Sequence, residues 1–190
     1  MDAEAWDRRY AAQDLLWSVE PNRFVAEELA ALPPGRALDL ACGEGRNALW
    51  LASLGWRATA ADFSGVAVGR GRELDPDGLV EWRVEDLTTW EFPEADLVLV
   101  AYLHLPEREM AAVLGRAARA VAPGGTLFFV GHDRTNLTEG VGGPQDPAIL
   151  HSPGSVADAL TGLRIERAER VRRPVGDRTA VDTLVRAVRE

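Results

Sequence analysis

The sequence predicts an α/β fold in which a mostly parallel, doubly wound sheet lies between two layers of helices. Short apolar runs alternate with segments whose apolar residues recur at helical spacing. A glycine loop, residues 41–45, follows the first apolar run and opens a helical segment. Asp62 and Asp86 then follow the next two apolar runs. This arrangement predicts a ligand site outside the carboxyl ends of the strands, as in Rossmann-like folds.

Seven short apolar runs are expected to be the strands of this sheet. Glycine and proline separate several of them from the helical segments. The last two runs are expected to close the sheet as a pair, with one antiparallel strand in an otherwise parallel sheet. The expected strands are residues 36–41, 56–62, 79–84, 95–101, 126–131, 163–171 and 180–188.

Helices are expected between the strands. The clearest covers residues 106–121, where apolar residues keep a helical spacing until Pro123-Gly124-Gly125. Gly55 ends the helix that follows the glycine loop. Three glycines weaken the helical signal in residues 64–73. The expected helices cover residues 3–12, 21–32, 46–54, 64–73, 106–121 and 154–161.

Residues 132–153 form a long segment that is rich in glycine and proline and has no period. Loops of this length in a compact domain are usually functional or disordered. The segment leaves the fifth strand at the ligand end of the sheet, which favours a part in an acceptor pocket. A surface loop without function is an equally good interpretation.

Composition agrees with a single domain over residues 1–190. The chain is 46% hydrophobic, which is enough to bury a substantial core. No apolar run reaches the roughly 18 residues of a membrane helix, and the polar start predicts no signal peptide. We therefore expect a cytoplasmic protein without a membrane partner. The single cysteine, Cys42, forms no internal disulfide and is expected to be a small core residue.

The formal net charge of -9 opposes binding to nucleic acid or to an anionic membrane. A cluster of arginines near the end of the chain is interrupted by Glu166 and Glu169, so we expect a solvated strand face there. The arginines of this cluster are Arg164, Arg167, Arg170, Arg172 and Arg173.

The charge of the glycine loop separates two classes of cofactor. Gly43, Gly45 and Ala48 fit the Gly-x-Gly-x-x-Ala fingerprint of dinucleotide sites, so the glycines alone leave both classes open. Asp39 and Glu44, however, place carboxylates where a pyrophosphate would bind. S-adenosylmethionine (SAM) presents an ammonium and a sulfonium, which carboxylates attract. The acidic series therefore favours SAM.

Several motifs resemble those of the class I SAM-dependent methyltransferases, in the same order and spacing. They are DLACGEGRN from Asp39, AADFS from Ala60, VEDL from Val84 and DLVLVAYLHL from Asp96. Within that superfamily, CGEGRN and the amino-terminal WDRRY and LWSVEPNRF resemble the branch of tellurite-resistance and thiopurine methyltransferases. Ala41 departs from the glycine of many members. The tail, GHDRTNLTEGVGGPQDP and VDTLVRA, resembles actinobacterial members, some of which methylate sugar hydroxyls, including those of methylated mannose polysaccharides.

The resemblance implies a cofactor site for SAM, or its product S-adenosylhomocysteine, beneath an amino-terminal helical lid (residues 1–33) on a core of residues 34–190. Asp39 would position the methionine moiety, Asp62 would accept both ribose hydroxyls, and Asp86 with the Leu87 N–H would meet the adenine. Each aspartate also has a purely structural interpretation. Asp39 could be a buried carboxylate that caps backbone N–H groups, Asp62 a helix cap, and Asp86 a turn residue. The expected cofactor-binding residues are Trp17, Asn22, Arg23, Asp39, Ala41, Gly43, Gly45, Arg46, Asp62, Phe63, Ser64, Asp86, Leu87 and Ala101.

On the acceptor side, a hydroxyl needs a base to remove its proton, whereas a thiolate or tellurite oxyanion needs none. His132, at the end of the fifth strand, is the first candidate for this base and His104 the second. Tyr102, Asp133 and His151 are expected near the substrate. His132, Asp133 and His151 also allow a divalent metal, although their spacing matches no specific metal motif.

These observations predict a SAM-dependent methyltransferase that acts on a small molecule or glycoside, most simply on a hydroxyl. A detoxifying enzyme that methylates sulfur, selenium or tellurium is the first alternative. An NAD-dependent oxidoreductase and a non-catalytic SAM-binding module are alternatives from other classes. The sequence leaves the acceptor, its regiochemistry and the oligomeric state open.

Overall fold

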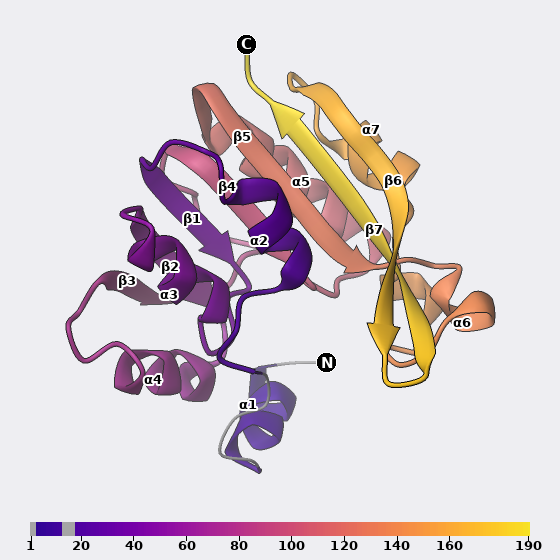
Figure 1. The fold of residues 1–190 in the computed structure, drawn as a ribbon, viewed down its shortest axis with the longest axis horizontal. Coiled ribbons are helices and arrows are strands. Elements are labelled where there is room, and N and C mark those ends of the chain that lie inside the picture. The colour runs from indigo at the N-terminus through magenta and orange to yellow at the C-terminus, as the bar shows by residue number, and fades with distance from the viewer. Residues whose placement is uncertain (1–2, 13–17) are drawn as a thin grey trace.

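The computed structural model describes residues 3–12 and 18–190. These residues contain one seven-stranded sheet, with the strands in the order β3-β2-β1-β4-β5-β7-β6 (Figure 1). β7 is antiparallel to both of its neighbours, and the remaining pairs are parallel. The predicted fold class is therefore confirmed. The strands are β1 (Arg36–Leu40), β2 (Arg57–Asp62), β3 (Val80–Val84), β4 (Ala95–Ala101), β5 (Val121–His132), β6 (Arg164–Val175) and β7 (Arg178–Val188).

Helices cover both faces of the sheet. On one face α2 and α3 pack against β1, β4 and β5, and α4 packs beside them against β2 and β3. On the other face α5 and α7 cover β4, β5 and β7. The helices are α1 (Ala3–Ala11), α2 (Arg23–Leu29), α3 (Arg46–Ser53), α4 (Gly65–Glu73), α5 (Glu107–Ala120), α6 (Asn136–Glu139) and α7 (Pro153–Ala159), with the 3-10 turn η1 (Pro147–Ile149) before α7.

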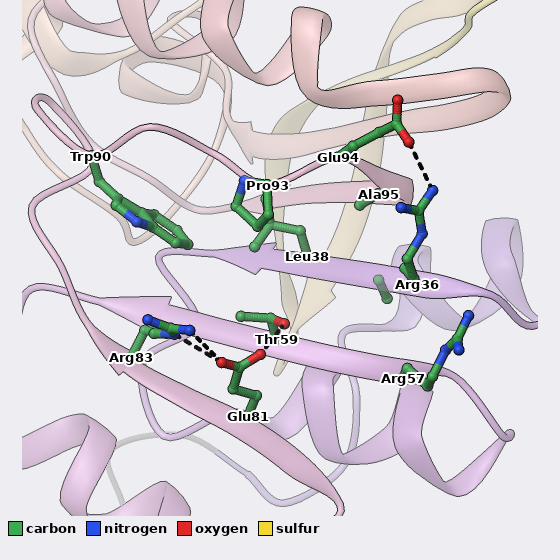
Figure 2. A pocket seen from close by; sticks show the side chains of 11 residues that line it. Arg36, Leu38, Arg57, Thr59, Glu81, Arg83, Trp90, Pro93, Glu94 and Ala95 are labelled. Carbon is green, nitrogen blue, oxygen red and sulfur yellow. Dashed lines mark hydrogen bonds and ion pairs between the residues drawn. The ribbon is translucent and has the colours of Figure 1, made fainter.

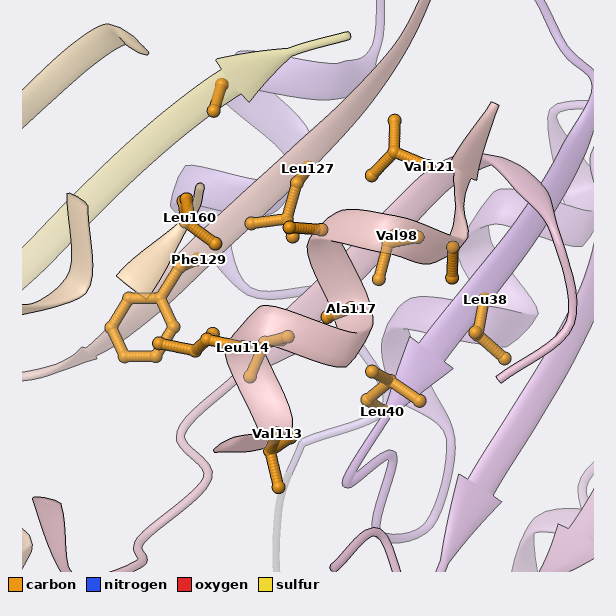
Figure 3. Close-up of a cluster of buried hydrophobic side chains, with 14 of the residues drawn as sticks. Leu38, Leu40, Val98, Val113, Leu114, Ala117, Val121, Leu127, Phe129 and Leu160 are labelled. Atoms are coloured by element: carbon orange, nitrogen blue, oxygen red, sulfur yellow. The ribbon is translucent and has the colours of Figure 1, made fainter. Parts of the chain in front are cut away.

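The largest buried cluster lies between α5 and the sheet (Figure 3). Val113, Leu114 and Ala117 lie on the face of α5 that meets Leu127 and Phe129 of β5. Burying a large aliphatic or aromatic side chain contributes about 1.5–3 kcal/mol. This cluster therefore anchors β4 and β5, whose carboxyl ends carry the acceptor-side candidates.

Two segments are more ordered than the sequence predicts. The segment 132–153 contains α6 and η1. The backbones of Asp133 and His151 pair in an isolated parallel β-bridge, which closes the segment into a compact loop. The hairpin of β6 and β7 continues to Val175 and Arg178, beyond the expected strand ends. Arginines and a proline hide this extension in the sequence, and proline is tolerated because β6 is an edge strand.

The arginine cluster of β6 is not a bare basic patch. Within the described residues every one of its arginines pairs with a carboxylate, which agrees with a solvated strand face. The pairs join Arg164 to Glu166 and Glu190, Arg167 to Glu28 and Glu169, Arg170 to Asp133, Arg172 to Glu139, and Arg173 to Asp182.

Among the described residues, no helix is long and apolar enough to cross a membrane.

Candidate functional site

The glycine loop turns sharply between β1 and α3. Ala41, Gly43 and Gly45 have φ values of 61°, 57° and 80°, in the left-handed region that favours glycine. A Cβ atom on Gly45 would lie 2.1 Å from the ring of Trp82. Gly45 is therefore required by packing as well as by the turn, because the indole of β3 supports the loop from below.

Asp39 is a buried carboxylate in β1, just before the glycine loop. It is 1% exposed, and neither of its oxygens has a hydrogen-bond partner within the described residues. Burial and the nearby charge of Asp62 raise the pKa of Asp39 to about 7. The Ala48 N–H, which does not reach hydrogen-bond geometry, and the charge of Arg46 oppose that shift in part. A buried, unpartnered carboxylate is costly, so this group is suited to a cationic ligand.

Asp62 ends β2 and ties the glycine loop to the start of α4. Its Oδ2 accepts from the Gly43 N–H and its Oδ1 from the Ser64 N–H, both at 2.9 Å. Ser64 caps α4 by accepting from the Ala67 N–H, while Phe63 is 36% exposed. Burial raises the pKa of Asp62, and the two backbone donors oppose that shift. Each carboxylate oxygen keeps a second acceptor position for a ligand hydroxyl.

Asp86 and Leu87 follow β3 at the same edge of the sheet. Asp86 is exposed, and its Oδ1 accepts from the backbone N–H and the hydroxyl of Thr88, at 2.8 and 2.7 Å. Leu87 is buried, and its carbonyl accepts from Arg116. The turn interpretation of Asp86 and its proposed adenine contact are compatible, because the turn uses one carboxylate oxygen.

The amino-terminal candidates separate into two groups. Asn22 is buried, caps α2, and donates from Nδ2 to the Tyr102 hydroxyl at 3.4 Å. Arg23 lies on the exposed side of α2 and pairs with Glu27, so its guanidinium does not join the others at the site. Trp17 lies outside the described residues.

Ala101 ends β4, and Tyr102 follows it in a left-handed conformation with a φ of 57°. The Tyr102 hydroxyl donates to Oδ2 of Asp182 at 2.9 Å. Arg46, the first residue of α3, is half-buried, and burial lowers its pKa while the charge of Asp39 opposes that shift.

His132 ends β5 among aromatic rings. Its imidazole stacks on that of His104, with centroids 5.7 Å apart and planes 9° apart, and meets Tyr102 edge-on at 5.0 Å. Its Nδ1 lies 3.2 Å from Oδ1 of Asp182. A Cβ atom on Gly143 would lie 2.8 Å from the same ring, so the segment after β5 folds back over it. The side chain of His132 retains 12% exposure.

His104 lies deeper than His132. Burial, followed by the charges of His132, His151 and Arg9, lowers the pKa of His104 to about 4. Its Nε2 is buried without a hydrogen-bond partner within the described chain. His104 is therefore neutral at physiological pH and stacks on the His132 ring.

Comparison with known proteins agrees with this geometry. Residues 37–125 match a family described as a methyltransferase domain. The match begins in β1 and ends within β5, so it covers the strands that carry Asp39, Asp62 and Asp86.

The curated relatives are longer than this chain. The ubiquinone biosynthesis O-methyltransferase of Xanthomonas campestris pv. campestris is 33% identical over 142 residues, which cover 70% of this chain and 58% of the relative. An uncharacterized methyltransferase of Synechocystis sp. is 33% identical over 112 residues, 57% of this chain and 52% of that protein. The chain thus spans between half and three fifths of these relatives.

Solved structures share the fold of this chain over nearly its whole length. An enzyme described as converting a disulfide bond into a thioacetal group during echinomycin biosynthesis has a TM-score of 0.77 at 24% identity, over 99% of this chain and 92% of that chain. TehB from Haemophilus influenzae scores 0.76 at 15% identity, over 99% and 67%. The N-methyltransferase NodS of Bradyrhizobium japonicum, in complex with S-adenosylhomocysteine, scores 0.72 at 19% identity, over 98% and 99%.

Two acceptor-side candidates hold the loop together. Asp133 is fully buried and accepts from Thr135, Arg170 and the Thr183 hydroxyl. His151 is buried, and its Nε2 lies 3.0 Å from the Leu105 carbonyl oxygen. Both side chains therefore anchor the segment 132–153, which follows β5. Within residues 3–12 and 18–190, no three His, Cys, Asp or Glu side chains lie together as metal ligands, and the metal hypothesis is not carried further.

Asp182 and Arg173 were missed by sequence reasoning. Asp182 is fully buried in β7, where its carboxylate contacts His132, Tyr102 and Arg173. A single acidic residue inside the apolar run AVDTLV is the signal that marks it. Arg173 lies in the part of β6 that the sequence did not predict as strand.

A pocket of the described residues lies away from this edge of the sheet. Between β3 and β4 the chain forms no helix, which leaves one face of β1–β3 uncovered (Figure 2). A pocket of about 350 Å³ lies there, lined by Arg36, Leu38, Thr59 and Glu81 among others. Arg36 begins β1, so this pocket is at the opposite end of the strand from the glycine loop. We locate the functional site at the carboxyl ends of the strands.

Proposed function

We propose that this protein transfers a methyl group from SAM to a hydroxyl of a small molecule or glycoside. Asp39 is the observation that carries the SAM assignment. Its carboxylate is buried and both oxygens are unpartnered within the described chain, so a cation is the ligand that compensates its burial. The relatives named as methyltransferases support the same conclusion.

A pyrophosphate fits this site poorly. The buried carboxylates of Asp39 and Asp62 flank the glycine loop and would repel a dianion. Glu44 contributes less to this argument than its position in the sequence predicts, because it pairs with Arg70 at 3.3 Å. An NAD-dependent oxidoreductase is therefore disfavoured by Asp62 and by the partly ionised Asp39, and less by Glu44.

Asp39, Asp62 and the Asp86–Leu87 turn are the residues that would hold the cofactor, through its methionine, ribose and adenine parts. When bound, SAM supplies a methyl group already activated by its sulfonium. The protein then needs to orient the acceptor, exclude water and, for a hydroxyl, remove one proton.

His132 favours a hydroxyl acceptor over sulfur, selenium or tellurium. An anionic chalcogen needs no base, yet this site places a partly exposed imidazole against Asp182 at the end of β5. His104 and Tyr102 pack on the same ring and limit its motion. A fixed imidazole of this kind suits removal of a hydroxyl proton.

An acceptor screen that measures S-adenosylhomocysteine production tests this proposal. Each acceptor is offered as a matched pair, with a hydroxyl or a thiol on the same skeleton, alongside glycosides and tellurite. We expect product with hydroxyl acceptors and a weaker response with the matched thiols. Turnover confined to thiols or tellurite would overturn the hydroxyl assignment, and SAM binding without turnover across the screen would favour a binding module.

A further inference from the structure

Asp182 lies opposite His132 in the antiparallel register of β5 and β7. Oδ1 of Asp182 and Nδ1 of His132 are 3.2 Å apart, and neither atom has a hydrogen-bond partner within the described residues. Leaving a buried polar atom without a hydrogen bond is unfavourable. Both atoms are satisfied together when Nδ1 carries the proton and donates it to Oδ1, which leaves the lone pair of Nε2 for another partner.

The second oxygen of Asp182 is held by two donors. Oδ2 accepts from the Tyr102 hydroxyl and from Nε of Arg173, each at 2.9 Å. Burial raises the pKa of Asp182, but His132 and Arg173 outweigh it and hold that pKa below its ordinary value. Burial and the Asp182 charge raise the pKa of Tyr102, so the phenol keeps its proton and remains a donor. The carboxylate is therefore ionised and fixed.

We propose that Asp182 is a positioning residue, which holds His132 in the Nδ1–H tautomer with Nε2 turned to the acceptor hydroxyl. This inference depends on the proposed function of His132 as a base. The hydroxyl proton would move to Nε2 and its electron pair would stay on oxygen, which forms the bond to the methyl carbon. The bond between that carbon and the sulfonium sulfur would break, and its electron pair would stay on sulfur. The imidazolium formed is stabilised by Asp182 and then returns its proton to water.

Groups on several segments face the His132 ring. His104, from the segment after β4, is neutral, and Tyr102 keeps its proton. Asp182 on β7 is the one anion with a contact to this imidazole in the described residues, and Arg173 on β6 acts on it through Asp182. Removal of the Asp182 charge should therefore make the imidazolium less stable.

Nitrogen NMR of the imidazoles in the full-length protein tests the contact without any need for activity. In the wild type we expect neutral His132 as the Nδ1–H tautomer. Asp182→Asn should move His132 toward the Nε2–H tautomer, because an amide can present a donor to Nδ1. Asp75→Asn is the matched control, because it changes another buried carboxylate, one that accepts hydrogen bonds from Leu79, Val80 and Trp82. This variant should leave the His132 tautomer unchanged.

Turnover with a hydroxyl acceptor provides the second measurement. Asp182→Asn should lower kcat by about 10²-fold, by analogy with other His–Asp pairs, with a smaller change in KM. An Nε2–H tautomer in wild-type His132, which is read without any variant, would overturn the proposal even if Asp182→Asn does not fold. An unchanged tautomer and kcat in folded Asp182→Asn would also overturn it. Near-wild-type turnover of a hydroxyl acceptor by His132→Ala, with the wild-type tautomer as expected, would instead contradict the proposed function.

Discussion

The two halves of the carboxyl edge of the sheet are built in different ways. The cofactor half, after β1, β2 and β3, takes its groups from short local motifs, with one aspartate for each strand. The acceptor half, after β4, β5 and within β7, is assembled from distant parts of the chain: Tyr102 and Asp182 are 80 residues apart. Local motifs thus build the part that we propose to bind SAM, and tertiary contacts build the part that we propose to face the acceptor.

The acceptor half should give the largest kinetic effect. His132→Ala removes the proposed base, so kcat on a hydroxyl acceptor should fall by about 10²- to 10⁴-fold while SAM affinity is retained. Steady-state kinetics and calorimetry on the same preparation measure both quantities. Near-wild-type turnover of a hydroxyl acceptor would exclude His132 as the base and would weaken the distinction between the halves.

In the cofactor half, the glycines should matter for stability according to their neighbours. A Cβ atom on Gly71 would lie 2.3 Å from the Trp82 ring, whereas one on Gly69 would meet nothing within 4 Å. Gly71→Ala should lower the free energy of unfolding by about 1–3 kcal/mol. Gly69→Ala, on the same helix, should raise it by about 0.5–1 kcal/mol. Equal changes in the free energy of unfolding for the two variants, measured by chemical denaturation, would show that Trp82 does not constrain α4.

Asp62→Ala should weaken SAM binding by about 1–3 kcal/mol, because charge-assisted hydrogen bonds to the ribose are lost. The same change removes the acceptor for the Gly43 and Ser64 N–H groups, so thermal unfolding must accompany the calorimetry. Unchanged affinity in a folded variant would remove Asp62 from the cofactor half.

Asp39 should make SAM binding depend on pH. Because its pKa is raised from 3.8 to about 7 in the folded protein, its contribution to stability falls as pH rises from about 4 to about 7. A cationic ligand favours the ionised form, so binding should release a proton and SAM affinity should rise between pH 5 and 7. Calorimetry in buffers of different ionisation enthalpy measures that proton. Asp39→Asn should abolish the dependence, and its persistence in the variant would assign it to another group.

The same division explains what the sequence could predict. The apolar runs and the helical period of α5 predicted the sheet and its helices, because burial decides both. The positions of Asp39 and Asp62 followed from the glycine loop. Asp182 could not be assigned a partner, because which groups a buried side chain in β7 meets depends on its register with β5, and Asp133 gave no sign that it would anchor a loop.

The most direct test of the central assignment is calorimetry with SAM, S-adenosylhomocysteine and NADH on the same protein. The cofactor half places the buried carboxylates of Asp39 and Asp62 beside the glycine loop, so we expect SAM and S-adenosylhomocysteine to bind in the micromolar range, about -8 kcal/mol. NADH should bind far more weakly. Tight binding of NADH with no signal for SAM would contradict the account.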